Sequence, residues 1–192
     1  MTPDDFPGLL DSWLIALAAE RKSAKTIKAS ADGVPGYLAF CDRERIEPVL
    51  DHATANAFTA SLLDAGAAAN TARSRQLAVR QFSAWLADEG LTGRDDLLGL
   101  KPPQVDTPNV PSLTDDELLA LIKACEGKTF RDRRDEAIVR FAAETTARAE
   151  EILAMGVGDV TLSAGMAVIQ RGKGGRGRRV PFGPRTGQAL DR

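Results

Sequence analysis

A proline-rich segment near the middle of the sequence sets the strongest limit on how the chain can fold. Four of the ten prolines of the sequence fall there, namely Pro102, Pro103, Pro108 and Pro111. Proline lacks a backbone N–H and clashes with the preceding helical turn, so a regular helix cannot run through this segment. We therefore predict an extended linker over residues 91–111, which separates one domain at residues 1–90 from another at residues 112–192.

Apolar residues before the linker recur at the spacing of amphipathic helices. The spacing predicts four helices, at residues 6–19, after an N-cap at Ser23, at residues 54–65 and at residues 70–89. Asn70 is the expected N-cap of the fourth helix, and the residues expected on its buried side are Leu77, Val79, Phe82, Trp85 and Leu86. Gly33 and Pro35 interrupt the second pattern and predict a kink or a break near Gly33. The first domain is therefore expected to be a four-helix module.

The pattern after the linker begins as helix and then changes to short strands. Thr114 and Glu117 form a capping-box signature that opens one helix, and a further helix is expected from Arg131 to Thr145. Strand-like runs follow at residues 159–162, 166–170 and 179–182, separated by glycine-rich turns. Residues 183–192 read as the beginning of another helix. The predicted fold class is mainly α, with a four-helix domain, a linker and a partial α+β domain that contains a small antiparallel sheet.

The formal net charge of −2 argues against a uniformly basic coat for nucleic acid, but the charges are unevenly distributed. From Gly165 to Arg192 there are seven basic residues and one acidic residue. No acidic residue occurs between Ala65 and Ala87, where Arg73, Arg75 and Arg80 lie. These two regions are the ones that could bind phosphate groups.

Several other classes of protein are disfavoured by the sequence. Cys41 and Cys125 lie far apart without metal-ligand spacing, which argues against a zinc site or a disulfide framework. No apolar run approaches the roughly 20 residues of a membrane-spanning helix, and the start does not resemble a secretory signal. A cytoplasmic location is the default expectation. His52 is interpreted as a surface residue and Tyr37, the single tyrosine, as a packing residue.

Three motifs follow one another in the second domain: RDEAI at residues 134–138, TTARAEEIL at 145–153 and GKGGRGRRVP at 172–181. They resemble the R-D-x-A-I, T-G-x-R-x-x-E-L and G-K-G-G-K-x-R-x-V-P patterns of tyrosine recombinases and phage integrases. A D-[IV] strand start, which those proteins also carry between the last two motifs, is present at residues 159–160. The resemblance implies a helical core-binding domain followed by the first part of a catalytic domain.

The resemblance also assigns roles to three residues of the second domain. It makes Arg148 the first catalytic arginine, Glu151 its acidic partner and Lys173 the lysine that protonates the leaving 5′ oxygen. An arginine at the start of a helix can aim its guanidinium fork at a phosphate, which favours this role for Arg148. Glu151 shares a helix face with Arg148 and could orient that side chain or a neighbouring basic one.

The partner that the resemblance implies is double-stranded DNA, bound together with further recombinase protomers. The expected DNA contacts are Lys25, Lys28, Arg73, Arg75, Arg80, Arg176, Arg178 and Arg179. In tyrosine recombinases a tyrosine attacks the phosphodiester and stores its energy in a covalent intermediate, so neither a metal nor a nucleotide cofactor is expected.

The sequence departs from the family pattern in two respects. Thr146 stands where the T-G-x-R motif has glycine, and no H-x-x-R motif or tyrosine follows Lys173. We therefore expect the chain alone not to cleave DNA. Three hypotheses remain open: a fragment of an integrase, a short protein that binds DNA without cutting it, and a helical protein-interaction module with a vestigial second domain. Salt-dependent affinity for DNA would separate the first two from the third.

Overall fold

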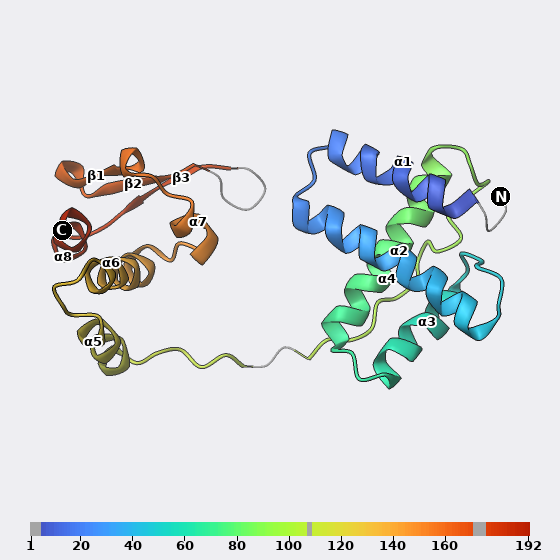
Figure 1. Cartoon of the computed structure of the whole chain (residues 1–192), viewed down its shortest axis with the longest axis horizontal. Helices are drawn as coiled ribbons and strands as arrows, with labels where there is room; N and C mark the ends of the chain where they lie inside the picture. The colour runs from blue at the N-terminus through green and yellow to red at the C-terminus, as the bar shows by residue number, and fades with distance from the viewer. Residues whose placement is uncertain (1–4, 107–108, 171–175) are drawn as a thin grey trace. The chain divides into compact units, whose positions relative to one another are not determined.

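The computed structural model describes residues 5–106, 109–170 and 176–192, and it divides the chain into two compact units, Met1–Pro108 and Asn109–Arg192 (Figure 1). The first unit consists of the helices α1 (Phe6–Ala19), α2 (Ala24–Glu44), α3 (His52–Asp64) and α4 (Ala69–Asp88). The predicted four-helix architecture is thus confirmed. None of the helices in the described ranges combines the length and the apolar character that crossing a bilayer requires.

Side chains at the helix starts explain where two of these helices begin. The Ser23 hydroxyl accepts a hydrogen bond from the Thr26 N–H at 3.1 Å, which confirms Ser23 as the N-cap of α2. The prediction of Asn70 as a cap is wrong: α4 begins one residue earlier, and its N-cap Ala68 offers no side-chain acceptor. The helix is held by packing instead, since Ala72 in its first turn is completely buried.

The core of the first unit has two clusters, and α2 and α4 contribute to both. One cluster gathers around Tyr37, Phe58 and Val79, and the other around Trp13 and Phe82. Trp13 and Phe82 place their ring centroids 5.3 Å apart. Val79, Phe82 and Leu86 of α4 are buried as predicted. The prediction for Leu77 is wrong: this side chain is 45% exposed, and Ala78 lies on the buried side of the helix instead.

Helix α2 is a single helix, so of the kink or break predicted near Gly33 the break is wrong and the kink stays a prediction. Pro35 lies inside the helix and is exposed, and it costs the helix one hydrogen bond and a steric clash, about 3 kcal/mol. Burial of the nearby Val34 and Tyr37 compensates for this cost, because a fully buried large side chain stabilises the fold by about 1.5–3 kcal/mol. Gly33 has a packing role, because a Cβ added there would lie 2.3 Å from the Cβ of Ala78 on α4.

The segment after α4 also differs from the prediction. Leu97 and Leu100 are 1% and 4% exposed and belong to the cluster around Tyr37 and Phe58. The Asp95 carboxylate accepts hydrogen bonds from the Leu97 N–H and from the Ser83 hydroxyl of α4, which fixes this turn against the helix. The expectation of an extended linker from Leu91 is therefore wrong as far as Leu100, because apolar burial binds this stretch to the first unit.

The close contact between α2 and α4 generates a prediction about two glycines of α2. Gly33→Ala should lower the free energy of unfolding by about 1–3 kcal/mol, because the new methyl group overpacks against Ala78. Gly36→Ala is the matched control, since the nearest atom to its added Cβ is a Phe58 ring carbon at 3.9 Å. It should raise the stability by about 0.5–1 kcal/mol through helix propensity. Urea unfolding measures the stability of both variants. Equal effects of the two substitutions would contradict the packing role of Gly33.

The second unit packs helices against a small sheet (Figure 1). Its helices are α5 (Asp115–Ala124), α6 (Phe130–Thr145), α7 (Ala149–Leu153) and α8 (Pro184–Asp191), with short 3-10 helices at Val157–Asp159 and Leu162–Ala164. The strands β1 (Val160–Thr161), β2 (Met166–Ile169) and β3 (Arg178–Pro181) form an antiparallel sheet in the order β1-β2-β3. The small antiparallel sheet and the Thr114–Glu117 capping box are therefore confirmed.

The core of the second unit lies between α6 and the sheet. Phe141 of α6 is 1% exposed and clusters with Ala167 and Ile169 of β2 and with Val180 of β3. Because β2 and β3 pair over four residues, with Ile169 opposite Arg178, the first residue of β3 has a fixed position in the sheet. This arrangement places the end of α6, the short helix α7 and the start of β3 around one site.

Candidate functional site

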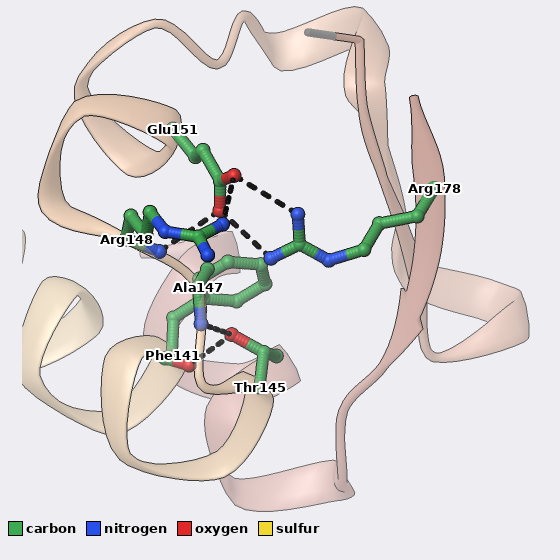
Figure 2. Close-up of polar contacts among 6 residues, drawn as sticks. All are labelled: Phe141, Thr145, Ala147, Arg148, Glu151 and Arg178. Carbon is green, nitrogen blue, oxygen red and sulfur yellow. Dashed lines mark hydrogen bonds and ion pairs between the residues drawn. The ribbon is translucent and has the colours of Figure 1, made fainter. Parts of the chain in front are cut away.

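The turn between α6 and α7 positions Arg148. Helix α6 ends at Thr145, and its C-cap residue Thr146 has the left-handed backbone angles φ 53° and ψ 23°. Arg148 then stands at the N-cap of α7 in an extended conformation. The buried Thr145 fixes the turn, because its hydroxyl donates to the Phe141 carbonyl at 2.6 Å and accepts from the Ala147 N–H at 3.4 Å (Figure 2).

The Glu151 carboxylate is the centre of the site. Its side chain is 5% exposed and lies within hydrogen-bonding distance of two arginines (Figure 2). Arg148 donates its backbone N–H to Oε2 at 2.9 Å and its Nη1 to Oε1 at 3.1 Å. Arg178, from the first position of β3, donates Nη1 to Oε1 at 2.9 Å and Nη2 to Oε2 at 2.7 Å. Each carboxylate oxygen is thus shared by the two arginines.

These donors keep Glu151 ionised. The hydrogen bonds from Arg178, followed by the one from the Arg148 backbone, lower the pKa of Glu151 from 4.5 to about 2, although burial acts in the opposite direction. The same carboxylate raises the pKa of Arg178. At neutral pH the site therefore holds one negative charge and two positive charges.

The two arginines differ in how much of each guanidinium remains free. Among the hydrogen bonds of the described residues, the Arg148 side chain makes only the one from Nη1 to Glu151, and it is 60% exposed. Arg178 is 37% exposed and directs both terminal nitrogens to Glu151. Arg148 thus keeps donors for an external anion, whereas Arg178, which the sequence predicted as a DNA contact, has an internal partner.

The remaining predicted residues of this hairpin are only partly described. Lys173 lies outside the described residues, so its predicted role stays a prediction. Arg176 and Arg179 are exposed. Arg179 follows Arg178 on β3 and therefore points to the other face of the sheet, since Arg178 shares its face with the buried Val180.

The structure brings together some of the basic residues predicted in the first unit. Lys25 and Lys28 of α2 and Arg75 of α4 line one groove of about 380 Å³. Asp32 lies 3.3 Å from both Lys28 and Arg75. Asp32 is not among the residues predicted from the sequence, although its position four residues after Lys28 is the spacing of a helical ion pair.

The other two predicted contacts on α4 do not line this groove. Arg73 is exposed, and Arg80 is half-buried with an Nε atom that has no hydrogen-bond partner. Arg73 and Arg80 lie seven residues apart, on the same side of α4, whereas Arg75 lies on a different side. Within the described ranges, no group of three or more His, Cys, Asp or Glu side chains is placed to hold a metal ion.

Comparisons with known proteins identify the family to which the chain is related. Residues 111–192 match the model of the phage integrase family. Across 185 residues the chain is 28% identical to tyrosine recombinase XerC of Pseudomonas syringae pv. tomato, a match that covers 95% of this chain and 62% of the relative. Across 135 residues it is 35% identical to tyrosine recombinase XerD of Mycobacterium leprae, covering 67% of this chain and 42% of the relative.

Solved structures show the same fold. Lambda integrase (residues 75–356) matches with a TM-score of 0.68 and 18% identity over 100% of this chain and 66% of that chain. The Tn1549 transposon integrase matches with a TM-score of 0.67 and 10% identity over 94% of this chain and 63% of that chain. The chain belongs to the tyrosine recombinase (phage integrase) family. It spans 62% of the length of the XerC relative.

The left-handed backbone of Thr146 generates a prediction about the turn. A non-glycine residue with left-handed backbone angles destabilises the folded chain by about 1–2 kcal/mol. A glycine removes this strain, but its greater conformational freedom in the unfolded chain cancels part of the stability that is gained. Thr146→Gly should therefore raise the free energy of unfolding by about 0.5–1 kcal/mol. Thr146 is exposed, so little packing is lost. Thr146→Ala keeps the strained backbone and serves as the control in thermal unfolding; an equal gain there would refute the explanation.

The low pKa of Glu151 generates a prediction about acid stability. Because folding depresses this pKa from 4.5 to about 2, the stabilisation is complete above pH 4.5 and is lost progressively as the pH falls toward 2. Glu151→Gln should lower the melting temperature at pH 7 and flatten its dependence on pH between 2 and 4.5. Circular dichroism melts across this range measure both effects. Glu150→Gln, in the same helix but exposed, should keep the wild-type slope. Superimposable profiles of Glu151→Gln and wild type would contradict the prediction.

Proposed function

We propose that this chain is the DNA-binding part of a tyrosine recombinase and that it holds duplex DNA at a recombination site. The observation that carries the proposal is the Arg148–Glu151–Arg178 cluster, in which an exposed arginine at a helix start is oriented by a buried carboxylate. A guanidinium held in this way can bind a phosphate bidentately with little loss of side-chain entropy. The sequence motifs around Arg148 and the family membership support a phosphodiester as the ligand.

The chemistry assigned to the site is stabilisation of charge on a phosphoryl group. Arg148 contacts the non-bridging oxygens of the phosphate and stabilises the charge that develops there during transfer. Glu151 orients Arg148 and remains ionised because of its two arginine partners. Lys173, by resemblance to the family, donates a proton to the leaving 5′ oxygen. Neither a metal nor a nucleotide cofactor takes part in this scheme.

The partners proposed for the chain are double-stranded DNA and further recombinase protomers. The lambda integrase structures that share this fold are described as a dimer bound to a core site and as a tetramer bound to a Holliday junction. The Tn1549 integrase is described in complex with circular intermediate DNA. These descriptions support the assignment of DNA as the ligand and of an assembly of several protomers on it.

The first unit is proposed as a second DNA contact, with residues 1–90 acting as a core-binding domain. The groove lined by Lys25, Lys28 and Arg75 presents three cations, and the exposed pairs with Asp32 are weak enough for phosphates to compete with them. The remaining proposed contacts in the two units are Arg73, Arg80, Arg176 and Arg179.

This chain alone is proposed not to cleave DNA. Its single tyrosine, Tyr37, is completely buried in the core of the first unit, and its hydroxyl donates to the Val49 carbonyl. Burial also raises the pKa of Tyr37, which disfavours the phenolate form that attacks phosphorus. The chain therefore offers no accessible tyrosine nucleophile.

Binding to duplex DNA across a salt series tests the proposed function. The logarithm of the association constant should fall linearly with the logarithm of salt concentration, with a slope of about −0.9 for each phosphate contact. Arg148→Ala should weaken binding by roughly 10- to 100-fold, as expected for a charge-assisted hydrogen bond. Lys173→Ala and Arg73→Ala/Arg75→Ala should also weaken it.

Arg131→Ala is the matched control in the second unit, because Arg131 is 83% exposed and pairs with Asp135 on α6. It should change the affinity much less than Arg148→Ala. If wild type shows no salt-dependent affinity, the DNA-binding proposal fails and a helical protein-interaction module becomes the better reading.

A nicked suicide substrate tests the proposed lack of cleavage. After incubation with the 192-residue chain, a denaturing gel should show no covalent adduct between protein and DNA. Tyr37→Phe should bind DNA as wild type does, apart from any loss of stability caused by removal of the bond to Val49. A covalent adduct formed by wild type and absent from Tyr37→Phe would contradict the proposal.

A further inference from the structure

We infer that Arg178 is a positioning residue that acts through Glu151 on Arg148 and does not itself bind DNA. The inference rests on the proposed function in one respect, namely that Arg148 is the residue that binds the phosphate. It changes the assignment that the sequence favoured, in which Arg178 was one of several equivalent basic residues of the hairpin.

The Arg178 guanidinium already has an internal partner in Glu151. Both terminal nitrogens lie on the two oxygens of Glu151, at 2.9 Å and 2.7 Å, in a bidentate pair. Arg148 holds the same carboxylate through its backbone N–H at 2.9 Å and through one side-chain nitrogen at 3.1 Å. The bidentate pair fixes the Arg178 guanidinium and the carboxylate in one geometry, whereas the single side-chain contact of Arg148 leaves most of its guanidinium donors unused. Arg178 therefore sets the orientation of the group that in turn orients Arg148.

Arg178 and Glu151 belong to different kinds of secondary structure, a strand and a short helix. Arg178 begins β3 opposite Ile169, which is 1% exposed, and Val180 anchors the strand in the core two residues later. Glu151 is the buried residue of α7, a helix of five residues. A helix this short has little stability of its own. The ion pair thus connects a strand that is anchored in the core to the short helix whose N-cap is Arg148 (Figure 2).

Arg179, the next residue on the strand, differs from Arg178 in its surroundings. Arg179 points to the opposite face of β3 and is exposed. The two adjacent arginines have the same chemistry, and they differ in which face of the sheet they occupy. Arg179 is therefore the natural candidate for a direct phosphate contact and the matched control for Arg178.

Double-mutant cycles of DNA affinity test the inference on the full chain. Arg178→Ala should weaken DNA binding about tenfold in the wild-type background, within the range for coupled neighbours, and should have little effect in an Arg148→Ala background. Arg179→Ala should weaken binding by the same factor in both backgrounds, because a direct contact is independent of Arg148. Arg178→Lys, which keeps the charge but cannot form the fork, should restore part of the lost affinity.

Two outcomes of the cycles would overturn the inference. An equal loss from Arg178→Ala in both backgrounds would mean either a direct phosphate contact or a general loss of stability. Full affinity of Arg178→Ala would mean that Arg148 needs no support from it.

A second measurement separates the inference from the proposed function. The Nε–Hε resonance of Arg148, observed by NMR without DNA, should shift or broaden in Arg178→Ala and stay unchanged in Arg179→Ala. If wild type fails to bind DNA, the proposed function fails while this resonance still decides whether Arg178 positions Arg148. An unchanged Arg148 resonance in a folded Arg178→Ala variant would overturn the positioning role. Backbone amide spectra of the same samples establish that each variant is folded.

Discussion

The second unit depends on the burial of one carboxylate. An ionised group that is 5% exposed is unfavourable unless charges and hydrogen bonds compensate for its lost hydration. Glu151 obtains that compensation from Arg148, three residues before it, and from Arg178, 27 residues after it. Loss of either arginine would leave the Glu151 charge without sufficient compensation. The charge of Glu151 therefore couples α7 to the start of β3. The exposed face of Arg148 is available for phosphate as a result of this arrangement.

The first unit uses its charges differently, and the contrast is relevant to DNA binding. Its core is apolar, and the close approach of α2 and α4 depends on the absence of a side chain at Gly33. Asp32 pairs with Lys28 and Arg75 at the surface, where such pairs contribute less than about 1 kcal/mol. In the proposed function, a DNA phosphate replaces Asp32 as the partner of these cations at little cost. The buried partners of Glu151 cannot be exchanged so easily.

Local patterns were sufficient to predict most elements, because helices and caps depend on residues close in the sequence. Ser23 and the Thr114–Glu117 pair mark helix starts through hydrogen bonds that span three residues. The errors have a different origin. The nearby prolines exclude a regular helix and so predict a linker that includes Leu97 and Leu100. A segment that is not helical can still be buried, as these two leucines are. Whether an apolar side chain in a turn finds a cluster to join depends on elements distant in the sequence.

The sequence by itself determined the order of helices and strands, the uneven distribution of basic residues and the motifs that place Arg148 and Glu151 three residues apart on one helical turn. Tertiary structure decided which of the adjacent Arg178 and Arg179 belongs to the site. That choice depends on the register of β3 against β2, which turns Arg178 toward α7 and Arg179 away from it. The composition and spacing of the sequence give no reason to assign different roles to the two arginines. Only the packing of the sheet against α6 and α7 shows which of them contacts Glu151.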